Sequence, residues 1–361
     1  MSFRYQQWGK YLVCLDQPLY AVVTRLLLNN SDTAMESIGI KRPSRKRLSR
    51  LVLKGKLGLA DPDHRVTLPV FGHIGMNVHG GIKIFDFDRM EVAKVFAQDI
   101  SRRAAGMEIE ASKLSSRIAA APRFLGADPE QRWYREEYIH GEDATTVDSE
   151  NPGRIAKFYT DAEKCLIELV GISETDDIDI RSHIDRKMNV SFQARWRESG
   201  LNQALIDGIT AYLGQLERWL KNRVGQDRLP LVMTHGDFSL VNAIWTDGGL
   251  RFIDWEGISP GALYSDILNF LYVEYYYGRA PANFRNCIST FMERYRGKIV
   301  ARFPELRQAA DLDPTIARRL YYLERMNWLL GRSATGNLSS VVEKSIEMFN
   351  EVDREFGETL E

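Results

Sequence analysis

Three oxygen-bearing side chains lie in apolar, strand-like surroundings between residues 231 and 267. Asp237 follows a histidine and a glycine, Asn242 comes five residues later, and Asp254 closes a short apolar run. Phosphoryl transfer needs a carboxylate that orients the attacking hydroxyl and accepts its proton. Mg²⁺ prefers oxygen ligands and leaves positions for water and phosphate. The sequence therefore predicts Asp237 as a catalytic base and Asn242 with Asp254 as metal ligands.

The segment that joins the two predicted metal ligands has the pattern of a β-hairpin. Apolar and polar residues alternate through 241–245, and Thr-Asp-Gly-Gly at 246–249 is a turn sequence. A hairpin would carry Asn242 and Asp254 on adjacent strands and could bring them close together. The alternative is a purely structural role for all three polar residues. The fixed spacing of these residues on a strand-loop-strand pattern favours the catalytic role.

The pattern H-G-D-x-x-x-x-N, followed by an apolar strand that ends Ile-Asp-Trp-Glu, resembles the aminoglycoside phosphotransferase and choline kinase superfamily. The resemblance covers residues 65–345 and is strongest at 231–267. It implies an ATP-dependent kinase that uses Mg²⁺ and transfers the γ-phosphoryl group to a hydroxyl of a small molecule. It also implies that Asp266 is structural and accepts hydrogen bonds from the catalytic-loop backbone.

The resemblance implies an α+β fold class: a bilobal protein-kinase-like fold with a small antiparallel β-sheet N-lobe and a larger, mostly helical C-lobe. The chain of 361 residues, 44% hydrophobic and 27% charged, suits two lobes. We expect a basic, helical extension at 1–60, the N-lobe with phosphate loop and hinge at 61–141, and the C-lobe with the catalytic and metal-binding loops at 142–361. Strands are expected at 66–71, 81–87, 90–96, 121–126 and 133–139, and helices at 100–120, 152–170 and 201–224.

Two backbone segments are expected to bind the nucleotide. In the kinase-like fold the first glycine turn covers the phosphates with its N–H groups, and the loop 72–77, with Gly72 and Gly75, is expected there. Its sequence is not the G-x-G-x-x-G of protein kinases. The resemblance further implies a hinge in which the backbone groups of Glu137 and Ile139 hydrogen-bond the adenine edge.

Lys94 is a charged residue inside an apolar strand, where an unpaired ammonium group is costly to bury. Its Val-Ala-Lys setting resembles the strand lysine that family members use on the α- and β-phosphates. Such a lysine needs a carboxylate partner on a helix. Glu110 is the best candidate because it shares a helix face with Leu114 and Ile118, and Glu108 is the second candidate.

Residues 1–60 differ from the rest in charge. They hold 11 lysine and arginine residues against three acidic ones, a net charge of +8, while the whole chain carries −1. Eight of these bases lie at 41–56, with leucines between them. A basic amphipathic segment of this kind can lie on an anionic membrane. A solvated helix that packs its leucines on the kinase lobe, or a partner-binding arm, are the other interpretations.

The composition excludes several classes. A net charge near zero argues against a nucleic-acid partner. The three cysteines are far apart and form no C-x-x-C, which predicts neither a zinc site nor a disulfide framework and favours a reducing cytoplasm. The apolar stretch 11–28 is too interrupted for a membrane span. We expect a cytoplasmic protein, with peripheral contact at the inner face of the membrane if 41–56 docks there.

The sequence leaves the acceptor open. A sugar or glycan precursor, a choline- or ethanolamine-type amino alcohol, and an aminoglycoside are the alternatives. The aromatic residues of 270–277 could bind a quaternary ammonium group, but a helix that packs them into the core explains them more simply. Glu256 is a further residue that could reach metal or acceptor. A kinase-fold protein that binds nucleotide or a partner without catalysis is the alternative of another class.

Overall fold

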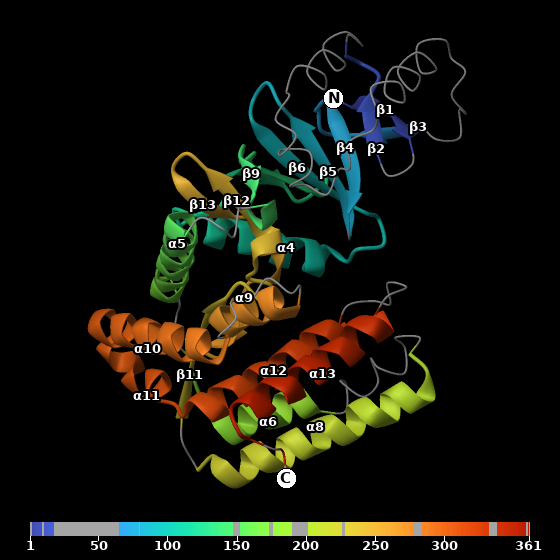
Figure 1. Ribbon diagram of the computed structural model, residues 1–361. Coiled ribbons are helices and arrows are strands. Elements are labelled where there is room, and N and C mark those ends of the chain that lie inside the picture. The colour runs from blue at the N-terminus through green and yellow to red at the C-terminus, as the bar shows by residue number, and fades with distance from the viewer. Residues whose placement is uncertain are drawn as a thin grey trace. The chain divides into compact units, whose positions relative to one another are not determined.

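The computed structural model describes residues 2–8, 11–17, 65–78, 80–146, 152–172, 176–189, 201–225, 228–276, 284–331, 338–358 and 360. The chain divides into two compact units, drawn in Figure 1: unit 1 holds Met1–Phe158 and Val241–Glu256, and unit 2 holds Tyr159–Leu240 and Gly257–Glu361. The hairpin segment with Asn242 and Asp254 thus belongs to unit 1, whereas the sequence analysis assigned it to 142–361. The basic run 41–56 lies outside the described residues.

Unit 1 is built on an antiparallel sheet in the order β3-β1-β2-β4-β5-β6-β8-β7. Two clusters of side chains cover one face of its central strands. Phe96 and Tyr134 pack with Ala105 and Ile109 of helix α4 (Arg102–Ser115), and a second cluster is formed around Phe85. The strands are β1 (Phe3–Trp8), β2 (Tyr11–Cys14), β3 (Arg65–Leu68), β4 (Ile74–Val78), β5 (Gly81–Asp86), β6 (Glu91–Phe96), β7 (Phe124–Asp128) and β8 (Trp133–Glu137).

The first described residues form strands, not the expected helical extension. Tyr5 and Cys14, paired across β1 and β2, are fully buried, and so is Leu12. The Tyr5 hydroxyl donates to the carbonyl of Val70 at 2.9 Å. Apolar side chains at every second position suit a strand, whose successive residues face opposite sides of the sheet. The sequence prediction was based on the high positive charge of 1–60 and did not use this short alternation of apolar and polar residues.

A smaller sheet completes unit 1. Strands β12 (Ala243–Thr246) and β13 (Gly249–Phe252) form the predicted hairpin, and β12 also pairs with β9 (Glu142–Asp143). The short helix η2 (Ala144–Thr146) follows β9, and α5 (Pro152–Gly171) begins in unit 1 and ends in unit 2.

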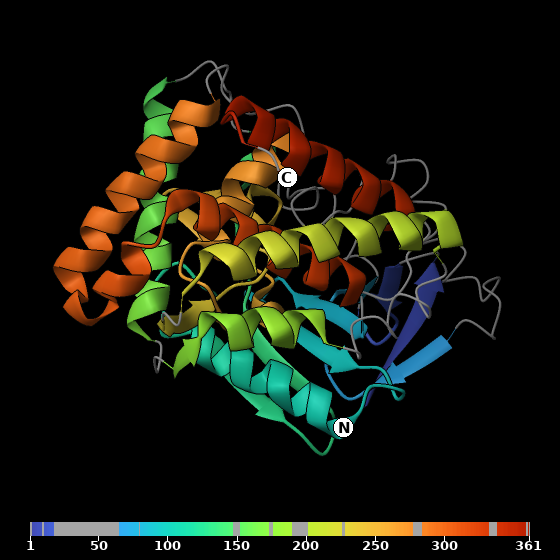
Figure 2. The same ribbon diagram turned by 90° about the horizontal axis from the view of Figure 1, so that it is seen from below.

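Unit 2 is mostly helical and is organised around helix α12 (Pro314–Gly331), which packs against α6, α8, α9 and α13. Figure 2 shows α8 beside α12. Strand β11 lies between β10 and β14 in a small antiparallel sheet. The other elements of unit 2 are β10 (Asp176–Asp179), α6 (Ile180–Met188), α8 (Gln203–Arg223), β11 (Arg228–Thr234), β14 (Ser259–Gly261), α9 (Ser265–Tyr276), α10 (Phe284–Arg302), η5 (Pro304–Leu306), α11 (Arg307–Ala310) and α13 (Leu338–Glu355). The short helices η3 (Leu240–Asn242) and η4 (Trp255–Gly257) each have residues in both units.

Aromatic residues of α9 belong to the core of unit 2. The hydroxyl of Tyr272 lies 2.7 Å from that of Tyr322 in α12, and both residues are fully buried. The ring of Phe349 in α13 stacks on Tyr322 with centroids 4.2 Å apart. Tyr272 is thus a packing residue, as the simpler interpretation of the aromatic cluster predicted.

Candidate active site

Lys94 is held by two carboxylates inside unit 1. Its Nζ lies 2.6 Å from Glu108 Oε1 on α4 and 2.7 Å from Glu256 Oε2, and only 2% of the lysine side chain is exposed. The Tyr134 hydroxyl donates to the same Glu108 oxygen at 3.0 Å. These contacts supply the charge partners that a buried ammonium group requires.

The predicted pairing of Lys94 with Glu110 is wrong, because Glu110 lies on another face of α4. Its side chain is 70% exposed and binds Lys113 at 2.6 Å. Glu108 lies one turn from both Ala105 and Ser112, which are buried on the side that packs on the sheet. The second candidate of the sequence analysis is therefore the partner.

A second lysine faces the same cluster. Lys83 on β5 lies directly opposite Lys94 on β6, and its Nζ forms an ion pair with Asp254. Burial lowers the pKa of Lys83, but the carboxylates of Asp254, Glu136 and Glu256 outweigh it and raise that pKa above its ordinary value. Lys83 was not predicted from the sequence, although a lysine with apolar neighbours in a strand was the signal that identified Lys94.

Glu136 on β8 completes this charged cluster. Burial raises the pKa of its carboxyl group to about 7, and the negative charges of Asp254 and Glu108 act in the same direction. Lys83 and Lys94 oppose the shift without cancelling it. The pKa of the Glu136 carboxyl group therefore lies near neutral pH.

The β12–β13 hairpin brings the two predicted metal ligands to one end of unit 1. Ala243 pairs with Phe252 at the base of the hairpin, and the Ile253 N–H donates to the carbonyl of Asn242 at 2.9 Å. Asp254 has φ +62, a left-handed conformation that residues other than glycine seldom adopt. Backbone strain of this kind is typical of functional sites.

Hydrogen bonds fix the hairpin to the rest of unit 1. The Phe252 N–H donates to the carbonyl of Ala120 at 2.7 Å. The Arg251 guanidinium donates to the carbonyl of Ala121 at 2.7 Å and to Glu137 Oε2 at 2.9 Å. These bonds hold the hairpin, directly before Asp254, against the rest of unit 1.

The predicted hinge begins at Glu137, the last residue of β8. The Glu137 N–H already donates to the carbonyl of Arg123 at 2.9 Å, so only its carbonyl suits the adenine contact. Its side chain binds Arg251, and although burial raises the pKa of this carboxyl group, that hydrogen bond and Arg123 hold it below the ordinary value. Ile139 is buried. Adenine binding by Glu137 and Ile139 stays a prediction.

The loop expected at 72–77 is wrong, because most of this segment is strand β4. Gly75 is a sheet residue, and a Cβ added there would lie 3.0 Å from Leu12 Cβ. A Cβ on Gly72 would meet the carbonyl oxygen of Phe85 at 2.9 Å, so close packing explains this glycine. Gly80, directly before β5, has φ +74, as a tight hairpin turn requires.

In unit 2, Asp266 anchors the loop that carries Asp237. Its carboxylate accepts the N–H of His235 at 2.6 Å and that of Gly236 at 3.0 Å. Burial raises the pKa of Asp266 to about 7, although both hydrogen bonds oppose the shift. Asn269, one turn later on α9, donates to the carbonyl of Phe238 at 2.9 Å. The predicted structural contact of Asp266 is thus confirmed.

Asp237 forms an ion pair that sequence analysis missed. Arg325 Nη1 lies 3.1 Å from Asp237 Oδ1, and the guanidinium lies 4.0 Å from the ring centroid of Trp328. The signal available for this ion pair was the position of Arg325 among the buried residues of α12. Asp237 belongs to unit 2 and Asn242 with Asp254 to unit 1, so the approach of the base to the metal ligands stays a prediction.

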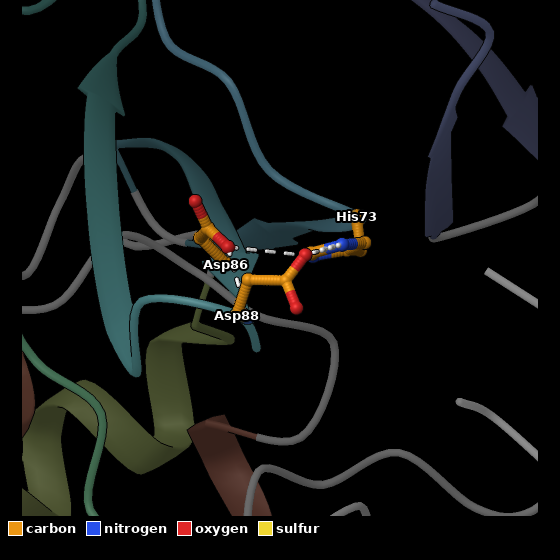
Figure 3. A group of neighbouring side chains, drawn as sticks. All are labelled: His73, Asp86 and Asp88. Atoms are coloured by element: carbon orange, nitrogen blue, oxygen red, sulfur yellow. Dashed lines mark hydrogen bonds and ion pairs between the residues drawn. The ribbon is translucent and has the colours of Figure 1, made fainter. Parts of the chain in front are cut away.

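Among the described residues, His73, Asp86 and Asp88 form a cluster with metal-ligand side chains (Figure 3). The Phe87 N–H donates to His73 Nδ1 at 3.2 Å, so the ring proton is on Nε2, 3.2 Å from Asp88 Oδ2. Asp86 Oδ1 accepts the N–H groups of Asp88 and Arg89. These bonds close the turn between β5 and β6 and explain the cluster structurally.

No helix within the described ranges combines the length and the apolar character needed to span a membrane.

A family model described as the phosphotransferase enzyme family matches residues 91–318, more than half of the chain. A choline kinase from Cryptosporidium parvum Iowa II is 14% identical, with 74% of this chain and 82% of that chain covered and a TM-score of 0.52. A glucosamine kinase in complex with glucosamine, ADP and inorganic phosphate is 13% identical, with coverage of 78% and 79% and a TM-score of 0.50. Curated protein sequences give no match. The structural likeness confirms the expected α+β, protein-kinase-like fold.

Proposed function

The chain belongs to the phosphotransferase enzyme family, and from that premise we propose that it is an ATP- and Mg²⁺-dependent kinase that phosphorylates a hydroxyl of a small molecule. The resemblance seen at His235-Gly236-Asp237 and the prediction of a phosphotransferase are confirmed by the family match over residues 91–318. The donor, the metal and the acceptor are parts of the proposal.

The observation that carries the proposal is the charged cluster of unit 1. Lys94 pairs with Glu108, and the segment with Asp254 and Glu256 meets the same sheet face through Lys83 and Lys94. A strand lysine paired to a helical glutamate, next to a carboxylate at the end of a hairpin, is the arrangement that phosphoryl transfer uses to position a nucleotide.

We assign the nucleotide contacts to Lys94 and to the backbone. Lys94 Nζ would bind the α- and β-phosphates, with Glu108 fixing its direction. Gly80, directly before β5, replaces the loop 72–77 as the position expected over the phosphates, since backbone N–H groups near a glycine can approach an anion closely. The carbonyl of Glu137 and the N–H of Ile139 would hold the adenine edge.

Asn242 and Asp254 would hold the metal. An amide oxygen and a carboxylate oxygen are ligand types that Mg²⁺ accepts. The hydrogen bond from the Ile253 N–H to the carbonyl of Asn242 holds the residue before Asp254 next to Asn242. The residues therefore fit the ion. When bound, Mg²⁺ offsets negative charge on the phosphate oxygens. Lys83 orients the Asp254 carboxylate in this arrangement.

Asp237 would orient the acceptor hydroxyl and accept its proton. The ion pair with Arg325 fixes the direction of this carboxylate, and Asp266 holds the loop beneath it through two N–H groups. A positioned base and an anchored loop are what in-line transfer to a hydroxyl requires.

Transfer of the radiolabelled γ-phosphoryl group from ATP to a panel of alcohols tests the proposal. The panel contains neutral sugars, amino sugars, sugar phosphates, sugar acids, choline and ethanolamine, and mass spectrometry identifies each product. Mg²⁺-dependent phosphorylation of at least one alcohol is expected. Tight binding of ATP without transfer to any alcohol or to water would instead favour a kinase-fold protein without catalysis.

A further inference from the structure

A cavity of about 380 Å³ lies within unit 2 beside the catalytic loop. Gly236 and Asp266 form part of its wall on one side, and Arg325 with Trp328 of α12 on another. Because Arg325 also binds Asp237 Oδ1 at 3.1 Å, the cavity adjoins the carboxylate that we assign as the base. It has the size of a small-molecule site.

The two carboxylates of this wall are already committed to protein donors. Glu324 Oε1 lies 2.7 Å from His183 Nε2 and accepts the Ala262 N–H at 3.2 Å, while Oε2 accepts the Ser265 hydroxyl. Burial alone would raise the pKa of Glu324, but His183 and Lys187 hold it at about 2. Asp266 likewise accepts two backbone N–H groups. Neither carboxylate is arranged to receive a cationic ligand.

Two cations also line this wall. Lys187, at the end of α6, lines the cavity with a half-buried side chain. Arg325 lines it as well, with its guanidinium between Asp237 and the ring of Trp328. A ligand ammonium group would meet two like charges here, whereas an oxyanion would meet a lysine and an arginine that can donate charge-assisted hydrogen bonds.

Building on the proposed kinase function, we propose that this cavity binds the acceptor and that the acceptor is a hydroxylated molecule bearing a phosphate or carboxylate group, which Lys187 and Arg325 bind. The hydroxyl is presented to Asp237 and the oxyanion to the two cations. This assignment disfavours choline, ethanolamine and aminoglycosides, which carry positive charge.

The test uses acceptors that share a carbon skeleton and differ in one charged or neutral substituent. One series is glycerol, glycerate, glycerol 3-phosphate and 3-amino-1,2-propanediol, and another is glucose, glucuronate, glucose 1-phosphate, glucose 6-phosphate and glucosamine. With the full chain, kcat/KM is expected to be at least about tenfold higher for anionic members, the scale of one hydrogen bond to a charged group. Comparison of the phosphate-bearing with the carboxylate-bearing members shows which of the two groups the cavity prefers. Preference for neutral or cationic members overturns this proposal and leaves the kinase function standing.

Variants on α6 provide the matched comparison. Lys187→Ala is expected to lose the preference for anionic acceptors by at least about tenfold, and Lys187→Glu to shift it toward the amino members. Arg186→Ala removes one positive charge from the neighbouring position of the same helix, an exposed residue outside the cavity wall, and is expected to keep the preference. Equal effects of Lys187→Ala and Arg186→Ala would contradict a direct role for Lys187.

A binding measurement separates failure of this proposal from failure of the kinase function. Inorganic phosphate is titrated calorimetrically into the wild-type chain and into Lys187→Ala, Arg186→Ala and Lys94→Ala. Binding is expected to weaken at least about tenfold in Lys187→Ala only. Loss in Lys94→Ala with retention in Lys187→Ala, or no binding to the wild type, overturns the proposal whatever the turnover assay gives.

Discussion

Lys83 lies directly opposite Lys94 in the antiparallel pairing of β5 and β6. Like charges at opposite positions of two strands repel each other, and the segment that follows β13 compensates both, with Asp254 on Lys83 and Glu256 on Lys94. The paired lysines therefore attach the hairpin to the sheet electrostatically, in addition to the hydrogen bonds of Arg251 and Phe252.

Replacing Lys83 should destabilise unit 1. Lys83→Met leaves the carboxylates of Asp254 and Glu136 without their nearest cation, and we expect the free energy of unfolding to fall by about 1–3 kcal/mol, the usual cost of an unsatisfied buried group. Urea unfolding measures this change. Lys83→Arg should recover most of it. Lys113→Met, at an exposed lysine of α4, should change stability little, and an equal loss there would contradict the argument.

Glu108 and Glu110 should differ sharply in their effect on nucleotide binding. Glu108→Gln removes a charged partner of Lys94, so we expect KM for ATP to rise on the order of tenfold. Glu110→Gln, two residues away on the exposed face of α4, should leave KM unchanged. Steady-state kinetics at saturating acceptor compare the two variants. A larger effect of Glu110→Gln would restore the original assignment.

Asp237→Asn should separate turnover from nucleotide binding. The amide cannot accept the acceptor proton, and we expect kcat to fall by about 10²–10⁴, the usual contribution of a positioned base. ATP affinity measured by calorimetry should stay near the wild-type value. Near-normal turnover in this variant would refute the assignment of Asp237 as the base.

Asp254→Ala should weaken ATP binding only when metal is present. Loss of a charged ligand is expected to reduce the affinity for Mg²⁺–ATP by at least about tenfold. With EDTA in place of Mg²⁺, wild type and variant should bind ATP alike. Since Lys83 also loses its partner, Asp254→Asn serves as a second variant that keeps the side-chain volume. An equal loss of affinity with and without Mg²⁺ would exclude a metal-ligand role.

Glu136 gives the stability of unit 1 a pH dependence. Its folded-state pKa of about 7 lies above the ordinary value of 4.5, so the protonated form favours folding. The contribution is complete below pH 4.5 and is lost as the pH rises to 7, a change of up to about 3 kcal/mol. The free energy of unfolding, measured at pH 5 and at pH 7, should decrease less between these two pH values in Glu136→Gln than in the wild type. Glu137→Gln, whose carboxyl pKa is shifted downward, should keep the wild-type slope in this range.

Much of the site was visible in the sequence because its signals are local. The alternation at 241–245 and the turn at 246–249 define the hairpin, and Lys94 is conspicuous as a charge inside an apolar strand. Asp266 and its contact with the catalytic-loop backbone also followed from the motif. In each case the relevant information lies within a few residues, where backbone periodicity and turn chemistry determine the structure.

The remaining parts depend on helix phase, strand register or distant partners. Glu108 and Glu110 differ by two residues, and only the face of α4 that packs on the sheet decides between them. The glycine turn was misplaced because 74–78 pairs with β5 as strand β4, which leaves Gly80 as the turn glycine. Lys83 and Asp254 are 171 positions apart, and Arg325 is 88 from Asp237. No local pattern connects such pairs.

The return of the chain to unit 1 at Val241–Glu256 has a consequence for biosynthesis. As the polypeptide leaves the ribosome, Lys83, Glu137 and the carbonyls of Ala120 and Ala121 are made long before the residues that bind them. Until synthesis has passed Glu256, Lys83 of the nascent N-terminal sheet therefore lacks Asp254, and Lys94 has Glu108 but not Glu256. A fragment that stops at Phe158 would keep this unfinished state permanently.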